Sequence, residues 1–328
     1  MFQTDYYILF DHIKLQGANA ISGPLSYGFP ALTGFTGAIH ALSRKLTHHN
    51  VQLGGVIVAC HDYELQTYQS SQFSDRTFKQ TRNPIKRDGK SASIIEEGKI
   101  HLDVSLVVEV RVPEQQLYNA LGDKQSETTQ QFLQECKELL WKQRIAGGSV
   151  LEIGEVQLFH LAEERDIPFA LMPAFVLMQA TNELVNITEE LKTGLRAGLL
   201  DEDGNIPHST LQAQPDATAL DALLEMATLH HIPAHPNASS VDWQTYSVKQ
   251  DRGWLVPIPV GYQAISPLFD AGQLQHCRTT VYPSQYVETI YSLGKWVFPF
   301  SLPDDLSQCF WRYRAPQNNL YLISQGEP

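Results

Sequence analysis

The chain has 328 residues, of which 43% are hydrophobic and 18% are charged, proportions that are ordinary for a folded protein with a sizeable core. Its formal net charge of −12 argues against a protein that coats nucleic acid without specificity. The charge is uneven, because residues 1–112 hold 11 Lys and Arg against 10 Asp and Glu, whereas the remaining residues hold 13 against 26. We therefore expect any site for a polyanion in the first third of the chain.

Four cysteines, at positions 60, 136, 277 and 309, are far apart and form no CxxC pair, a pattern typical of a reduced protein with buried thiols. The first ten residues, MFQTDYYILF, lack a basic region and a cleavage site, so no signal peptide is expected. No apolar run approaches the length of a membrane span. These features predict a cytoplasmic protein that does not contact a membrane.

The first predicted elements are a strand at 5–15, an irregular loop rich in Gly, Asn, Ser and Pro, and a helix at 31–47. Apolar residues recur in the helix at alternating spacings of three and four, which is the pattern of one buried helix face. The first amides of the helix are a natural seat for phosphate, although on the turn alone an ordinary strand-to-helix connection through Gly28 and Pro30 is the simpler interpretation. The apolar residues are Leu32, Phe35, Ile39, Leu42 and Leu46, and the opposite face carries Thr33, Gly37, His40 and Arg44.

Three more strands and a second helix complete a regular pattern. The apolar run at 51–60 predicts a central strand, and residues 99–112 alternate strictly, with even-numbered residues toward the core and odd-numbered residues on a polar face. A helix is predicted at 128–145, with Gly147 and Gly148 as its stop, followed by a strand at 149–161. The order β-α-β-β-α-β predicts an α+β protein with a ferredoxin-like (RRM-like) domain over residues 1–161.

The connection at 61–98 is far longer than neighbouring strands of such a sheet require, so we expect it to be functional. Pro84 and the turn at Asp88 and Gly89 can fold this insertion into a hairpin, a thumb on the domain. Its basic cluster with interleaved aromatic residues favours RNA binding, whereas the simplest alternative is a solvated, flexible loop. The basic residues are Arg76, Lys79, Arg82, Lys86, Arg87 and Lys90, opposed by Asp75 and Asp88, and the aromatic residues are Tyr68, Phe73 and Phe78.

Residues 162–328 give weaker signals and predict a mixed, partly irregular C-terminal region. We expect helical structure at 168–200, a polar loop at 201–219, a short helix at 219–230, an irregular proline-dense segment at 253–268 and a helix at 283–293. The short helix is expected to bury Leu220, Leu223, Leu224 and Ala227, and the linker after it holds His230, His231 and His235. These histidines have no Cys or carboxylate partner at a convincing spacing, so neither a metal site nor another cofactor is expected.

Five separated stretches, in order along the chain, resemble a known family. They read ANAISGPLSYGFPALTGFTGAIHAL, TRNPIKRDG, IIEEGKIHLDVSL, RIAGGSVL and GWLVPIPVGY, and the likeness spans about residues 8–313. The sequence resembles the subunit of prokaryotic type I-F CRISPR Csy (Cascade) complexes that holds the 5′ handle of the guide RNA (crRNA), a member of the RAMP superfamily.

The resemblance implies a non-catalytic, RNA-binding protein with a thumb inserted in a ferredoxin-like domain. It implies two protein partners, the large subunit that recognises the protospacer-adjacent motif (PAM) and the first repeated backbone subunit. It also matches RIAGGSVL, at residues 144–151, with the superfamily's glycine-rich loop, whose amides can approach RNA closely. Contact with target double-stranded DNA near the PAM is left open.

The predicted RNA-binding residues divide by chemistry. Basic thumb residues and Arg44 suit phosphates, Asn19 and Asn83 suit bases or sugars, and Tyr27, Phe29 and Phe78 suit base stacking. For Tyr27 and Phe29, packing in the core is an equally good interpretation. The full set is Asn19, Ser22, Tyr27, Phe29, His40, Arg44, Arg76, Phe78, Lys79, Arg82, Asn83, Lys86, Arg87, Lys90, Arg144, Gly147, Gly148 and Ser149.

Two alternative functions belong to other classes. A RAMP-type endoribonuclease would use His40 as its general base, but no second converging acid or base is evident. A free-standing RRM-like regulator would carry aromatic residues on its central strand, where KIHLDVSLVVEV has none.

Overall fold

The computed structural model describes residues 2–113, 121, 123–195, 212–233, 243–277, 279–314 and 319–326. The protein is α+β, with mostly antiparallel sheets. Its contacts divide it into two compact units, the first formed by Met1–Val176, Pro259–Ile290 and Phe298–Pro328, and the second by Leu177–Ile258 and Tyr291–Val297. The sequence-based division after residue 161 stays a prediction.

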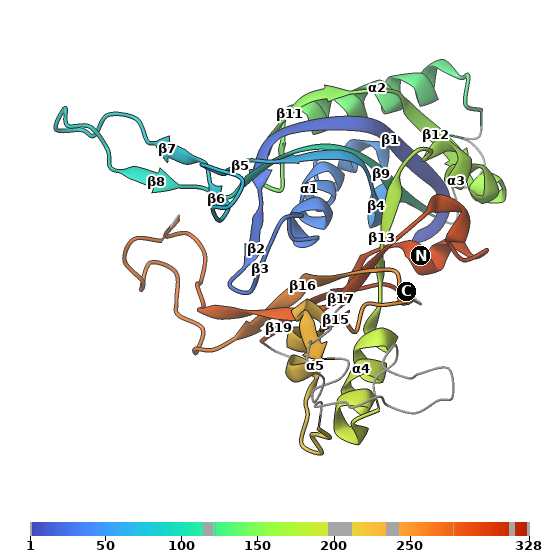
Figure 1. Ribbon diagram of the computed structural model, residues 1–328. Coiled ribbons are helices and arrows are strands. Elements are labelled where there is room, and N and C mark those ends of the chain that lie inside the picture. Colours follow the sequence, from blue (N-terminus) through green and yellow to red (C-terminus); the bar gives the residue numbers. More distant parts are fainter. Residues whose placement is uncertain are drawn as a thin grey trace. The chain divides into compact units, whose positions relative to one another are not determined.

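Neighbouring strands of one antiparallel sheet form the centre of the first unit (Figure 1). Strand β9 (Lys99–Pro113) lies between β1 (Phe2–Asn19) and β4 (Gln52–Leu65). On its other edge, β1 pairs with β11 (Gly148–Ile153) and β12 (Val156–His160). The strands predicted from the sequence are therefore present, and the first of them is longer than expected.

The two predicted helices lie between these strands in the chain. Helix α1 (Thr33–Ser43) packs on β4, helix α2 (Glu127–Trp141) packs on β11 and β12, and the helices contact each other. Both are shorter than predicted. Gly147 and Gly148 do not stop α2, as was expected. Ala146 and Gly147 form the tight turn that joins β10 (Arg144–Ile145) to β11, and Gly148 is the first residue of β11.

The register of β9 is the predicted one, but its second face is not an exposed polar face. Leu106 on the predicted core face is fully buried, and so are Ser105 and Glu109 on the opposite face. A distant segment covers that second face, since Phe310 stacks on Tyr7 at 5.1 Å between ring centroids. The expectation that the odd-numbered residues all face solvent was therefore wrong, because local periodicity carries no information about a segment 200 residues away.

Short elements complete the first unit. All four cysteines are free; Cys277 is half-exposed and the other three are buried. The short elements are β2 (Ile21–Gly23), β3 (Ser26–Tyr27), η1 (Thr47–His49), β5 (Thr67–Tyr68), β6 (Thr77–Phe78), β7 (Gln80–Arg82), β8 (Ile94–Glu96), η3 (Leu161–Asp166), α3 (Ile167–Ala170), η4 (Pro299–Ser301), η5 (Leu306–Cys309), β18 (Arg312–Arg314) and β19 (Leu320–Ser324).

The second unit has its own small core. Helices α4 (Thr181–Thr193) and α5 (Ala219–Ala227) pack together, and β14 (His230–Pro233) pairs with β15 (Trp243–Tyr246). Arg252 is paired with Glu183 at 3.0 Å and with Glu190, both on α4. The buried residues include Ile187, Leu191, Ala222, Leu223, Met226 and Tyr246.

Several expectations for the C-terminal half were wrong. The expected helix at 168–200 is interrupted by β13 (Phe175–Gln179), the segment at 253–268 contains the regular strand β16 (Trp254–Ala264), and the expected helix at 283–293 is largely β17 (Val287–Val297). Helix α5 buries Leu223 as expected, leaves Leu220, Leu224 and Ala227 exposed, and also buries Met226. The linker at 230–240 begins as strand β14. Its His235, and residues 201–211 of the polar loop, lie outside the described residues. No helix in the described part of the chain is long and apolar enough to cross a membrane.

Candidate nucleic-acid interface

The insertion at 61–98 is a two-stranded arm (Figure 1). Strand β4 continues into the arm as far as Leu65, after which β5 pairs with β6 and β7 pairs with β8. At the tip, the amide of Lys86 donates to the carbonyl of Lys90 at 2.9 Å, and Gly89 takes a φ of 79°, which favours glycine. The arm is therefore an ordered hairpin with the turn expected from its Asp-Gly sequence.

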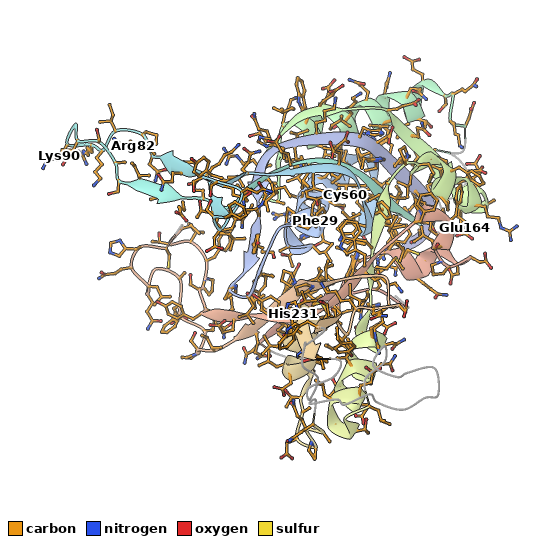
Figure 2. All side chains as sticks on the ribbon, in the orientation of Figure 1. Phe29, Cys60, Arg82, Lys90, Glu164 and His231 are labelled. Carbon is orange, nitrogen blue, oxygen red and sulfur yellow. The ribbon has the colours of Figure 1, made fainter. Side chains whose placement is uncertain are left out.

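The six basic side chains of the arm are exposed. Arg82, Lys86 and Arg87 form no ion pair with any residue that the structure describes, and the one acidic neighbour of Lys90, Asp88, is 3.8 Å away. Closer to the body, Lys79 donates to the Gln66 side chain at 2.6 Å, a neutral partner. Arg82 and Lys90 lie toward the far end of the arm (Figure 2). Positive charge that no carboxylate neutralises is available to a polyanion.

Four of the six acidic residues of the insertion lie at its base, and the other two, Asp75 and Asp88, lie among the basic residues farther out. Asp62 and Glu64 are on β4, and Glu96 and Glu97 are at or after the end of β8. The arm is thus basic along its outer part and acidic where it joins the sheet. This segregation favours contact with an anion at the outer part of the hairpin.

Two of the three residues predicted to stack on bases contact each other, and the third packs elsewhere. Tyr27 on β3 and Phe78 on β6 contact edge to face at 5.5 Å, and the Tyr27 side chain is 67% exposed. Phe29 instead stacks on the fully buried Phe35 at 5.5 Å. The structure therefore places Phe29 against the core and leaves the Tyr27–Phe78 pair on the surface.

The glycine-rich hairpin packs against the end of β1. The Asn19 amide donates to the carbonyl of Ala146 at 2.9 Å, and a Cβ on Gly148 would lie only 2.9 Å from the backbone of Ala18. The Asn19 side chain is already bonded to both backbone groups of Ile21, at 2.8 and 3.2 Å. The close packing against Ala18 therefore leaves no room for a side chain at Gly148. Arg144 and Ser149, which are cross-strand partners, have exposed side chains beside it.

Helix α1 does not offer the phosphate site that the sequence suggested at its first turn. Its first amides are occupied, because Gly34 donates to Ala31 while Phe35 and Thr36 donate to Leu32. A phosphate seat at this end is therefore not supported. His40 and Arg44 are exposed on the outer face, and no described acid or base lies within hydrogen-bond reach of the His40 ring. Ser22 holds its own hairpin through the Ser26 hydroxyl at 2.9 Å.

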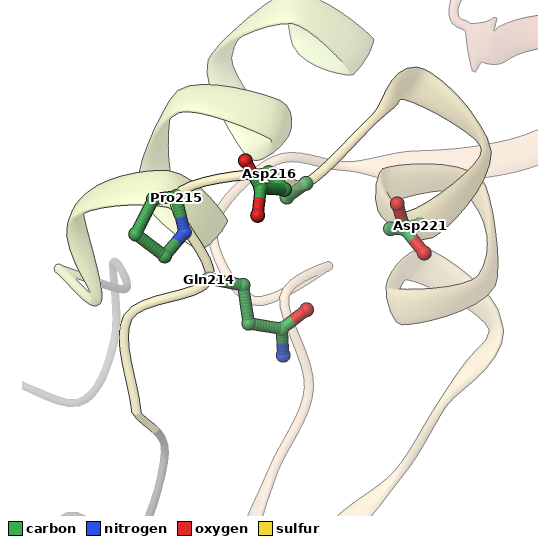
Figure 3. A pocket seen from close by; sticks show the side chains of 5 residues that line it. Gln214, Pro215, Asp216 and Asp221 are labelled. Carbon is green, nitrogen blue, oxygen red and sulfur yellow. The ribbon is translucent and has the colours of Figure 1, made fainter.

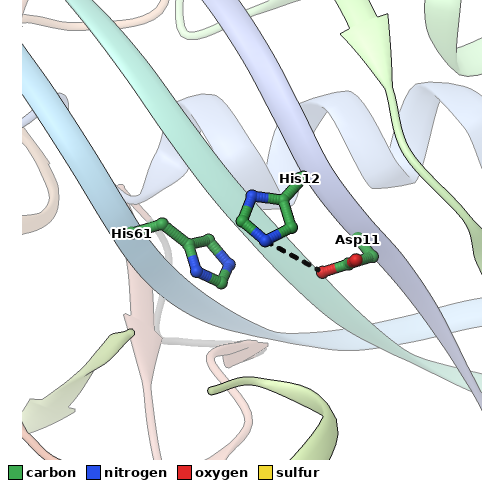
Figure 4. Close-up of side chains that lie close together, drawn as sticks. All are labelled: Asp11, His12 and His61. Atoms are coloured by element: carbon green, nitrogen blue, oxygen red, sulfur yellow. Dashed lines mark ion pairs between the residues drawn. The ribbon is translucent and has the colours of Figure 1, made fainter. Parts of the chain in front are cut away.

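Two clusters of titratable residues were missed in the sequence. One contains Asp11 and His12 on β1 and His61 on β4 (Figure 4). Burial lowers the pKa of His61, and the His12 ring beside it acts in the same direction. The other contains His48, His49 and Glu135, in which the His49 contact holds the Glu135 pKa below its usual value. Both combine residues far apart in the chain, so no sequence spacing signals them.

A hollow of about 290 Å³ lies in the second unit, before and along α5 (Figure 3). Its lining includes Asp216 and Asp221. The Asp221 carboxylate is already engaged with the amide and hydroxyl of Thr218, at 2.7 and 2.6 Å, as a helix cap. The hollow therefore shows no converging catalytic groups.

The proteins to which this chain is similar belong to one family. Residues 8–323 match the family described as CRISPR-associated protein (Cas_Csy2). A protein from Pseudomonas aeruginosa (strain UCBPP-PA14), CRISPR-associated protein Csy2, is 33% identical over 337 residues, which cover 96% of this chain and 93% of the relative. This α+β protein with its basic arm is thus a CRISPR-associated protein. It belongs to the Csy2 family, so the resemblance to the type I-F Csy-complex subunit is confirmed.

Proposed function

We propose that this chain is a non-catalytic, cytoplasmic subunit that binds the 5′ handle of crRNA in a type I-F Csy complex. The observation that carries the proposal is the outer arm, where Arg82, Lys86 and Arg87 are exposed and have no ion-pair partner among the described residues. Phosphate contacts of this kind strengthen and position binding, and the Tyr27–Phe78 pair offers aromatic surface near the arm's base. Asn83, in the same part of the arm, is exposed and suited to a base or sugar.

The arrangement of the first unit supports a ferredoxin-like (RRM-like) domain over residues 1–161. The strand order β11–β1–β9–β4 is antiparallel throughout, and each helix connects two strands of this set. The arm leaves the sheet between β4 and β9, as a thumb inserted in that fold would. In this interpretation, residues 162–328 form the C-terminal region.

The proposed partners follow from membership of a Csy complex. We infer a heterodimer with the large PAM-recognising subunit and a contact with the first repeated backbone subunit.

Two features weigh against the alternatives. His40 has no acid or base partner among the described residues, which disfavours a His40-dependent endoribonuclease. The sheet face that an RRM offers to RNA is occupied here, because Tyr7 is covered by Phe310 and Glu109 by Arg312. That disfavours a free-standing RRM-like regulator.

The experiment is a salt titration of handle binding by the heterodimer. Replacing Arg76, Lys79, Arg82 and Arg87 by Ala should weaken binding and flatten the dependence on salt by about 0.7 in log–log slope per lost phosphate contact. Discrimination between the handle and a scrambled RNA should persist in part, because phosphate contacts carry no sequence information.

The control variant removes four positive charges outside the arm. A variant with Lys14, Lys142, Lys192 and Lys249 replaced by Ala changes the net charge equally but leaves the arm intact. It should bind with nearly the wild-type slope. If both variants behave alike, or if the arm variant binds as wild type does, the arm does not hold the handle.

A further inference from the structure

Irregularities in two strands bring two histidines to one place in the first unit. The pairing of β9 with β1 shifts between Phe10 and Ile13, and its pairing with β4 shifts between Cys60 and Asp62. His12 and His61 occupy these interruptions, and His12 takes a φ of 45°. Because a bulge redirects a side chain, both rings reach the same surface of the sheet, stacked with centroids 3.9 Å apart (Figure 4).

Each ring is held through its Nδ1 atom. The His12 Nδ1 lies 3.0 and 3.1 Å from the two carboxylate oxygens of Asp103, and the His61 Nδ1 lies 2.8 Å from the carbonyl oxygen of Pro173. Carboxylate and carbonyl oxygens only accept, so each Nδ1 carries the hydrogen that is donated. In the neutral rings, each Nε2 therefore presents a lone pair.

With both rings neutral, the hydrogens at Ser105 leave one acceptor of the cluster without a donor. The Ser105 hydroxyl oxygen accepts from the His12 amide at 3.0 Å and lies 2.7 Å from His61 Nε2 and 2.9 Å from an Asp11 carboxylate oxygen. One hydroxyl hydrogen faces two acceptors. Whichever acceptor takes it, the other is left with a lone pair and no donor from Ser105.

We propose that Asp11, His12 and His61 bind a divalent metal ion of the zinc type through one carboxylate oxygen and the two Nε2 atoms. These three ligand atoms already lie within 4.8 Å of one another. Ligands of one tetrahedral zinc ion are about 3.3 Å apart, so the two rings tilt out of the stack, each about its Nδ1 contact, until the Nε2 lone pairs converge. Two nitrogens and one oxygen suit zinc, with a fourth position for water.

The surroundings are those of a metal site. Ligating histidines donate their other ring N–H to a carboxylate or a backbone carbonyl, as the Asp103 and Pro173 contacts provide here. The side chains of His12 and Asp11 are 40% and 25% exposed, which gives an ion a path from solvent. A bound ion would join β1 to β4 across β9 and would stabilise the sheet where the arm begins.

The second histidine cluster lacks these features and provides an internal control. His48 and His49 both direct Nε2 at Glu135, at 3.1 and 2.7 Å, but no carboxylate or carbonyl of the described residues holds either Nδ1 atom. The arrangement is that of a surface ion-pair cluster.

The test uses the full chain, freed of metal with a chelator and then titrated with Zn²⁺ and, separately, with Co²⁺. We expect one ion per chain, a rise in Tm with Zn²⁺, and the visible absorption of a four-coordinate Co²⁺ complex. His12→Asn and His61→Gln should each weaken Zn²⁺ affinity at least tenfold, and Asp103→Asn should weaken it about tenfold. Asn suits position 12 because it tolerates a positive φ.

The control is His48→Asn combined with His49→Gln, which should leave the Zn²⁺ response unchanged. Circular dichroism without metal establishes that each variant is folded, and if His61→Gln does not fold, His12→Asn decides the matter. The proposal is overturned if Zn²⁺ does not raise the wild-type Tm, if His12→Asn responds as wild type does, or if only the control loses the response.

Discussion

At the scale of single residues, one buried ion pair links the middle of the chain to its end. Arg312 donates to the two Glu109 carboxylate oxygens, at 2.6 and 3.1 Å, and the Gly55 amide donates to the same carboxylate at 2.6 Å. Burial by itself would raise the pKa of Glu109, but Arg312, the Gly55 amide and Arg111 together outweigh it and hold that pKa below its usual value. Glu109 is therefore ionised in the fold at neutral pH.

This pair predicts an acid-sensitive contribution to stability. A carboxyl group whose pKa is lower in the folded than in the unfolded state stabilises the fold fully above the unfolded pKa, about 4.3 for Glu, and loses that effect as the pH falls through the folded value. Glu109→Gln should therefore lose stability at neutral pH and show a smaller decline below about pH 4.3. Urea unfolding of wild type and variant across this range measures the difference. Parallel pH dependences for the two proteins would contradict the assignment.

At the scale of elements, the sequence predicted the central sheet because its signals are local. The period-two pattern of 99–112 depends on neighbouring residues alone, and β9 has the predicted core face. Strand β16 was missed because Pro257 and Pro259 argued against a strand. Since these prolines are two residues apart, both missing N–H groups fall on the same edge of the strand, and the other edge keeps its donors.

The same reasoning explains what could be predicted of the site. The basic arm could be predicted, because its basic residues lie close together in the chain. The segment is also far longer than a connection between neighbouring strands requires. The Asp11–His12–His61 cluster could not, because it depends on two bulges whose positions are set by pairing with β9. The hydrogen bonds that occupy the first amides of α1 could not be predicted either, because they depend on local backbone geometry.

Substitutions of two adjacent residues of β9 should each lower stability, because both faces of the strand are buried. Leu106→Ala should cost about 2–5 kcal/mol through the cavity that it leaves. Ser105→Ala should cost about 1–3 kcal/mol, because the His12 amide then loses its acceptor. Urea midpoints of the two variants are compared with that of Ser91→Ala, an exposed serine in the arm, which should match wild type. A Ser105→Ala midpoint equal to that of Ser91→Ala would mean that the second face is open to solvent.

At the scale of the whole molecule, exposed aromatic side chains mark a surface that favours a protein partner. Phe169 contacts Phe300 at 4.8 Å between ring centroids, Phe298 contacts Phe300 at 5.7 Å, and Phe175 contacts Phe298 at 6.3 Å. All four belong to the first unit and are exposed, Phe169 to 67%. Contiguous exposed aromatic surface is characteristic of protein–protein contacts.

The last prediction is that this aromatic cluster contributes to the proposed heterodimer. Co-expression with the large subunit should raise the soluble yield of the chain and give a 1:1 complex. Phe169→Ser combined with Phe300→Ser should reduce that co-purification while changing the free energy of unfolding little, since both side chains are largely exposed. The matched control, Val281→Ser with Tyr282→Ser, removes two other exposed apolar side chains of the same unit and should leave the complex intact. Size-exclusion chromatography of the co-expressed pairs measures the outcome. If the Phe variant still elutes as a full heterodimer, the aromatic cluster does not form that interface. If the wild-type chain elutes as a monomer beside the large subunit, the heterodimer itself is refuted.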